Sequence, residues 1–157
     1  MKKMIFFSAI VLITDQFTKL LVDKFVDYAS CINIIPFFNL FNITNIRNTG
    51  IVWGILKGKN LLFSFVIFSF LVIVSLWFHK NLTKMHKTQR YAFCLIISGG
   101  LGNLMDRLLY GGVVDFLDFG INHLRWPSFN IADSCICVAV ILVFFVNILD
   151  FNKDIHS

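Results

Sequence analysis

The stretch LLFSFVIFSFLVIVSLWF, residues 61–78, contains no charged side chain. A helix needs about 20 predominantly apolar residues to cross the hydrocarbon core of a bilayer, so this stretch predicts a membrane-spanning helix. The whole chain has the same character, because 57% of its 157 residues are hydrophobic and only 15% are charged. That composition is too apolar for a soluble domain and indicates a multi-pass membrane protein.

Three further apolar runs predict three more spanning helices, at roughly residues 4–22, 91–109 and 130–149. The first run begins like a signal peptide, with Lys2 and Lys3 before an apolar segment. No A-x-A cleavage site follows, and the apolar character continues to Val22, so we predict an uncleaved first helix. The length allows one domain, and we expect residues 1–157 to form a single integral-membrane domain.

Basic residues predict the orientation of these helices. The link between the second and third helices carries Lys80, Lys84, Lys87 and Arg90 and no acidic residue. Short loops rich in lysine and arginine stay in the cytoplasm. We therefore predict that this link and both termini are cytoplasmic, and that residues 23–60 and 110–129 lie outside.

The first outer segment alternates loosely between apolar and polar residues over residues 34–56, which is compatible with short strands on the membrane surface. Within it, Asn48-Thr49-Gly50 indicates a turn, and Trp53 is a candidate anchor at the membrane interface. We predict a small sheet here, followed by an amphipathic piece. The fold class is thus an all-α membrane protein with a small sheet between helices one and two.

Other function classes fit poorly. The net charge of +5 does not indicate nucleic-acid binding, because the basic residues gather at presumed membrane edges. The cysteines form no C-x-x-C motif, so we expect small buried hydrophobes and neither a disulfide nor a metal site: Cys31, Cys94, Cys135 and Cys137. A histidine-based site is not expected either, since only His123 lies away from the cytoplasmic side and the tail.

The third predicted helix carries a polar face. Asn103, Asp106 and Arg107 are spaced i, i+3 and i+4, so they share one side of the helix. The three glycines just before them allow another helix to approach closely: Gly99, Gly100 and Gly102. Two interpretations stay open for Asp106 and Arg107: a structural ion pair at the helix end, or direct contact with substrate.

The first predicted helix contains Asp15 and Lys19 at i and i+4, which allows an intrahelical ion pair. Counted from Met4 at 1.5 Å per residue, Asp15 lies roughly 16 Å along the helix. A carboxylate at that depth should face the helix bundle. We expect it to support a site and not to perform chemistry itself.

The stretch VVDFLDFGINHLRWPSFNIADS, residues 113–134, contains three aspartates among apolar residues. Asp133 lies three residues after Asn130, a candidate N-cap of the fourth helix, so helix capping alone could explain it. Asp115 has an apolar setting and no nearby cation in the sequence, whereas we expect Asp118 to be a more solvated surface residue.

Asp115 and Asp133 together suggest a reaction. Two carboxyls held close in a low-dielectric pocket share a proton, so that one activates a water and the other polarises a carbonyl. The helix dipole would favour an ionised Asp133, and the apolar setting a protonated Asp115. Such a pair hydrolyses amides without a metal, and no H-E-x-x-H or G-x-S-x-G motif competes with it.

Five blocks of the sequence resemble lipoprotein signal peptidase (signal peptidase II), a family of bacterial membrane aspartic endopeptidases. They occur in the family's order and span most of the chain: Asp15-Gln16-Phe17-Thr18-Lys19, Arg47-Asn48-Thr49-Gly50, Gly99-Gly100-Leu101-Gly102-Asn103-Leu104-Met105-Asp106-Arg107, Val113-Val114-Asp115-Phe116 and Phe129-Asn130-Ile131-Ala132-Asp133-Ser134. Each block is short, but the set is specific.

The resemblance implies four transmembrane helices with an extracytoplasmic β-cradle after the first, and Asp115 and Asp133 as the catalytic pair. Other residues match family positions that bind substrate or support the site: Asp15, Asn48, Asn103, Asp106, Arg107 and Asn130. It implies cleavage of diacylglyceryl-modified prolipoproteins before the lipidated cysteine, without metal or cofactor. We expect a monomer in the bacterial inner membrane, in contact with lipid, with its active site at the outer face.

One departure from the family pattern follows Gly50, where small residues usually precede an aromatic one. Ile51 and Val52 stand here, and their bulk puts substrate preference in question.

Two other function classes remain as alternatives. A proton-coupled transporter subunit or assembly factor predicts carboxylates spread across the membrane depth. A phosphotransferase whose aspartates hold magnesium predicts sensitivity to chelators.

Overall fold

The computed structural model describes residues 1–50 and 60–156. Trp53, the candidate interface anchor, lies outside the described residues, as do the predicted amphipathic piece and the bulky pair Ile51 and Val52. The elements that carry the predicted site residues are all described.

Four long helices form most of the molecule: α1 (Lys2–Phe25), α2 (Asn60–Asn81), α3 (Lys87–Tyr110) and α4 (Ile131–His156). All four are long and apolar enough to cross a membrane. Each contains nearly the whole range predicted for it, which confirms the four predicted helices. The helices extend beyond the apolar runs at most ends, because polar end residues continue the backbone hydrogen bonding.

A four-stranded antiparallel sheet accompanies the helices, in the order β1-β2-β3-β4. Its strands are β1 (Cys31–Ile35), β2 (Phe41–Asn48), β3 (Val113–Ile121) and β4 (Leu124–Arg125). The prediction that the sheet lies between helices one and two is therefore only half right, because β3 and β4 come between α3 and α4. A lone hairpin is marginally stable, and β3 completes the sheet by pairing along β2.

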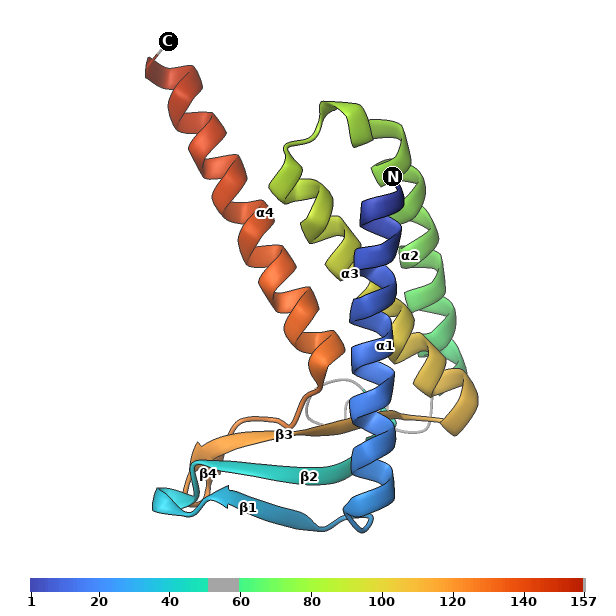
Figure 1. Cartoon of the computed structure of the whole chain (residues 1–157), viewed down its shortest axis with the longest axis vertical. Helices are drawn as coiled ribbons and strands as arrows, with labels where there is room; N and C mark the ends of the chain where they lie inside the picture. Colours follow the sequence, from blue (N-terminus) through green and yellow to red (C-terminus); the bar gives the residue numbers. More distant parts are fainter. Residues whose placement is uncertain (51–59, 157) are drawn as a thin grey trace.

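The sheet lies across one end of the helix bundle (Figure 1). Both termini and the link between α2 and α3 lie toward the opposite end of the helices (Figure 1). At the sheet end, Val22 of α1 and Val26, which follows this helix, pack with Val114 and Phe116 of β3 in a small buried cluster. This cluster fixes β3, and with it Asp115, against the end of α1.

Helix α3 packs against each of the other three helices, and consecutive glycines make room for them. A Cβ atom on Gly99 would lie 2.6 Å from the carbonyl oxygen of Ala132 in α4. One on Gly100 would lie 2.6 Å from Leu71 Cδ2 in α2, and one on Gly102 would lie 2.5 Å from Asp15 Oδ2 in α1. The predicted close helix approach at these glycines is confirmed, and each glycine serves a different neighbour.

Candidate active site

Asp115 lies on β3, directly opposite Ile46 of β2, and is only 3% exposed. Asn48 Nδ2, at the end of β2, donates a hydrogen bond to Asp115 Oδ2 at 2.9 Å. Asn130 Nδ2 donates to the other carboxyl oxygen, Asp115 Oδ1, at 2.8 Å. Both oxygens of this carboxyl therefore accept from neutral amides.

Asp133 lies in the first turn of α4. Its backbone N–H donates to Asn130 Oδ1 at 3.0 Å, and its Oδ2 accepts from the backbone N–H of Asn130 at 3.3 Å. The predicted helix cap at Asn130 is thus confirmed. Capping does not account for the other oxygen, Asp133 Oδ1, which accepts a 2.7 Å hydrogen bond from Asn103 Nδ2 on α3.

Asn130 joins the two carboxyls. Its backbone N–H and its Oδ1 bind Asp133, while its Nδ2 donates to Asp115. The side chain is fully buried, with 0% exposure, so its amide is held on all sides. The two aspartates are 18 positions apart in the sequence, and one asparagine side chain brings them together.

The environment favours a proton on Asp115. Burial in the protein interior raises its pKa from the ordinary 3.8 to about 7, and the negative charge of nearby Asp133 adds to this rise. The hydrogen bonds from Asn48 and Asn130 and the charge of Lys19 act in the opposite direction. Two carboxyls that interact in this way exchange protons as a pair.

A cationic cluster lies beside this pair. The buried ammonium group of Lys19 binds Asp15 Oδ2 at 2.8 Å and Asp106 Oδ2 at 3.0 Å. The predicted Asp15–Lys19 pair is therefore confirmed, and Asp106 pairs with this lysine rather than with its neighbour Arg107. We call Asp15, Lys19 and Asp106 the Lys19 cluster.

The Lys19 cluster also braces the backbone around the site. Asp15 Oδ1 accepts from the backbone N–H of Ala132, next to Asp133, at 2.9 Å. Asp106 Oδ2 accepts from the backbone N–H of Val114, next to Asp115, at 3.2 Å. Each carboxylate thus holds the residue that precedes one member of the Asp115–Asp133 pair. Sequence spacing indicated the bond between Asp15 and Lys19, but it gave no signal for these longer-range contacts.

Arg107 extends from α3 toward the end of β2. Its guanidinium donates to the carbonyl oxygen of Gly50 at 3.2 Å and to that of Asn103 at 3.5 Å. Its Nε is buried and has no hydrogen-bond partner among the described residues. All the site residues predicted from the sequence therefore lie in one connected region, with Arg107 at its edge.

Asp118 follows the prediction only in part. Its side chain is only 14% exposed and forms an ion pair with Arg125, whose Nη2 lies 2.7 Å from Asp118 Oδ2. Asn42 Nδ2 donates to the same oxygen at 2.9 Å. Asp118 is therefore more exposed than Asp115, as expected, but it is not a plain surface residue, because β4 places Arg125 beside it.

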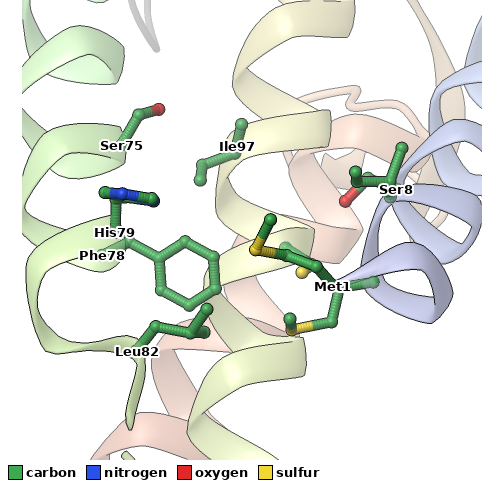
Figure 2. Close-up of a pocket in the computed structure, with 10 residues that line it drawn as sticks. Met1, Ser8, Ser75, Phe78, His79, Leu82 and Ile97 are labelled. Carbon is green, nitrogen blue, oxygen red and sulfur yellow. The ribbon is translucent and has the colours of Figure 1, made fainter.

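A cavity of about 290 Å³ lies elsewhere, among α1, α2 and α3. Figure 2 shows Ser8 of α1, Ser75 and His79 of α2 and Ile97 of α3 around it. Its lining includes no carboxylate, and His79 lies near the end of α2 that is remote from the sheet. This cavity does not belong to the aspartate site.

Among the described residues, no three His, Cys, Asp or Glu side chains are grouped to hold a metal ion.

The arrangement at Asp115 and Asp133 suits general acid–base chemistry. Asp133 is partly exposed whereas Asp115 is buried, so the pair lies at the boundary between the protein interior and its surroundings. Every hydrogen bond described for the four carboxyl oxygens comes from an amide donor. A carboxylate can keep lone pairs for a water after such bonds, and the pair can carry one shared proton.

Comparison with known proteins gives a consistent result. A family model described as signal peptidase (SPase) II matches residues 7–149. A lipoprotein signal peptidase of Nitratidesulfovibrio vulgaris is 37% identical to this chain, covering 87% of this chain and 84% of that protein. A lipoprotein signal peptidase of Staphylococcus aureus is 39% identical, covering 88% of this chain and 83% of that protein. A solved bacterial membrane enzyme superposes with a TM-score of 0.86 at 34% identity, covering 98% of this chain and 92% of that one.

Proposed function

Because the chain belongs to the signal peptidase II family, it is a peptidase that removes signal peptides from prolipoproteins, and we propose that Asp115 and Asp133 are its catalytic pair. The observation that carries this proposal is the side chain of Asn130, which contacts both carboxyls and holds them together. The raised pKa of Asp115, about 7, supports a single proton on the pair at neutral pH.

The proposed reaction begins with Asp133 ionised and Asp115 protonated. Asp133 takes a proton from water as the water oxygen bonds to the scissile carbonyl carbon, and Asp115 donates its proton to the carbonyl oxygen. The C–N bond then breaks. The leaving nitrogen takes the proton from Asp133, and the carbonyl oxygen returns the other proton to Asp115. No metal or cofactor takes part.

We place this site at the outer face of the bacterial inner membrane, with both termini in the cytoplasm. The sheet and the two aspartates lie at one end of the helices, and the termini lie toward the other end (Figure 1). The link after α2, with Lys80 and Lys84, is also at the end with the termini, and basic links of this kind stay in the cytoplasm.

The substrate we propose is a prolipoprotein that already carries diacylglycerol, cut before the lipidated cysteine. Its signal helix and its lipid chains both reside in the bilayer, so the enzyme must work at the membrane edge. Apolar side chains exposed on and beside the sheet support contact with lipid there: Ile32, Ile34, Ile35, Phe37, Phe38 and Leu124.

Isosteric substitution of the pair tests the proposal. The full chain carrying Asp115→Asn or Asp133→Asn should fold normally but cleave a synthetic diacylglyceryl-prolipopeptide about 10³-fold more slowly or worse, as expected for loss of a general acid or base. Cleavage is followed by gel or mass spectrometry on purified protein. Cleavage by either variant at near wild-type rate would refute the pair.

Asp118→Asn is the matched control, because Asp118 lies three residues further along β3 and is paired with Arg125, away from the site. It should retain wild-type activity.

A second experiment adds a chelator to the wild-type enzyme. An undiminished rate is expected, whereas inhibition would favour magnesium-dependent chemistry.

A further inference from the structure

Asn103 links the Lys19 cluster to the Asp115–Asp133 pair. It lies on α3, and its amide nitrogen donates to Asp133 Oδ1 at 2.7 Å. On its other side, Asn103 Oδ1 accepts from Lys19 Nζ at 3.0 Å and from Asn130 Nδ2 at 3.2 Å. One end of this amide therefore faces a buried cation, and the other faces a carboxyl of the pair.

Lys19 and Asn130 both favour one orientation of this amide, and Lys19 supplies the charged donor. A lysine ammonium group has three donors and no acceptor, so the atom that faces it must be the oxygen of Asn103. If the amide turned over, its NH₂ group would face the ammonium, and its oxygen would face Asp133 Oδ1. Lys19 is only 3% exposed, so water cannot readily restore the lost hydrogen bonds, and burying unpaired polar groups is costly.

Lys19 makes its described polar contacts inside the protein and not at the surface. The ammonium contacts Asp15, Asp106 and Asn103, which accounts for its three hydrogens. It is too deeply buried to reach a substrate. Its positive charge also attracts the carboxylate of Asp115 through space, so a test must separate that effect from the orientation of the amide.

We propose that Lys19 is a positioning residue for the hydrolysis: by holding Asn103 Oδ1, it keeps the amide hydrogens of Asn103 on Asp133 and so stabilises the carboxylate that accepts the proton of water. This inference rests on the proposed function, because it assumes that Asp133 acts as the base. It extends the site from the residues that touch substrate to a buried cation on α1.

A double-mutant cycle on kcat tests this role. Lys19→Met, Asn103→Ala and the double variant are assayed on the diacylglyceryl-prolipopeptide in the same detergent micelles. Lys19→Met should lower kcat by about tenfold or more in the wild-type background, but by less than about threefold when Asn103 is already alanine. KM should change by less than about twofold, since a buried residue makes no contact with substrate.

Two controls separate positioning from general damage. Lys24→Met makes the same change on an exposed part of α1 and should leave kcat unchanged. Ser98→Ala disturbs a buried part of the helix that carries Asn103, because Ser98 Oγ donates to the carbonyl oxygen of Cys94. No hydrogen bond joins Ser98 to Asn103 or to the Lys19 cluster among the described contacts, so the effects of Ser98→Ala and Asn103→Ala on kcat should multiply.

A second variant guards against misfolding of Lys19→Met, which leaves buried carboxylates without their cation. Asp15→Asn/Lys19→Met removes one charge of each sign together and still lacks the donor to Asn103. It should show the same loss of kcat and the same dependence on Asn103. If the effects of Lys19 and Asn103 multiply in both backgrounds, or if both Lys19 variants keep wild-type kcat, the positioning role is wrong.

The proposed function fails in a different way. If Asp115→Asn or Asp133→Asn retains activity, the catalytic pair itself is wrong, whatever the cycle shows. If those variants are inactive and the cycle is additive, only the role of Lys19 is overturned.

Discussion

Two sets of buried carboxyls lie side by side in this protein and differ in what holds them together. Asp15 and Asp106 have the ammonium group of Lys19 between them, at 2.8 and 3.0 Å. Asp115 and Asp133 share contacts with the neutral side chain of Asn130. Among the side chains that the structure describes, in residues 1–50 and 60–149, no lysine or arginine forms an ion pair with either member of this second set.

The difference shows how one fold assigns two roles to the same residue type. The carboxyl oxygens of Asp15 and Asp106 accept hydrogen bonds from the ammonium group of Lys19 and from backbone N–H groups, and so they brace the backbone. Amide donors satisfy a carboxyl without supplying charge, so two such carboxyls relieve their repulsion by sharing a proton. The first set braces the structure, whereas the second is the pair that we propose exchanges protons with the substrate.

The largest expected contrast is in stability. Asp106→Ala leaves buried Lys19 with one carboxylate fewer and also removes the acceptor for the backbone N–H of Val114. It should lower the free energy of unfolding by about 3–5 kcal/mol, as for other broken buried ion pairs. Asp115→Asn should cost less, about 1–3 kcal/mol, because it breaks no ion pair but replaces one of the two oxygens that accept from Asn48 and Asn130 by an NH₂ group. Thermal unfolding in detergent compares the two, and equal losses would remove the distinction between the sets.

Helix packing around the Lys19 cluster gives a smaller effect. A methyl group on Gly102 would lie 2.5 Å from Asp15 Oδ2, which cannot move without leaving Lys19 or the backbone of Ala132. Gly102→Ala should therefore cost about 1–3 kcal/mol of stability and also reduce activity. Gly100→Ala is the matched control on the same helix, because it meets only the flexible end of Leu71. A milder loss with activity retained is expected there, and indistinguishable variants would contradict the account.

The four spans could be predicted from the sequence because each is a long apolar run, and membrane crossing depends on length and hydropathy. The strand β3 could not be predicted from the sequence in this way. Its aspartates at positions 115 and 118 are three residues apart, so the segment lacks the strict alternation that indicates a strand. Its partner β2 lies about 70 residues earlier in the chain, and pairing over such a separation leaves no local signal.

The site likewise combines contacts that local sequence spacing predicts with contacts that it does not. The capping role of Asn130 and the Asp15–Lys19 pair follow from i, i+3 and i, i+4 spacing, and both are confirmed. The contacts of Lys19 with Asp106 and Asn103 join α1 to α3, so only the folded structure reveals them. The ion pair of Asp118 was missed for this reason too, since Arg125 reaches it only after β4 folds back on β3.

The smallest expected effect is a change in pH dependence. Asp115, with its pKa raised to about 7, carries its proton below that pH and loses it above, so kcat/KM should fall as the pH rises through about 7. The hydrogen bond from Asn48 favours the ionised form of Asp115. Asn48→Ala should therefore move this fall to higher pH, by about one unit or less. A shift to lower pH, or none, would mean that another group controls the alkaline limb.

The central claim is that Asp115 and Asp133 hold one proton between them near neutral pH. Infrared difference spectroscopy of the full chain, with labelled aspartate, counts protonated carboxyls directly as the pH is changed. The account predicts one protonated carboxyl that persists well above the ordinary aspartate range, titrates near pH 7 and is missing from Asp115→Asn. If every aspartate is already ionised at pH 6, or if the band survives in Asp115→Asn, the shared-proton pair is contradicted.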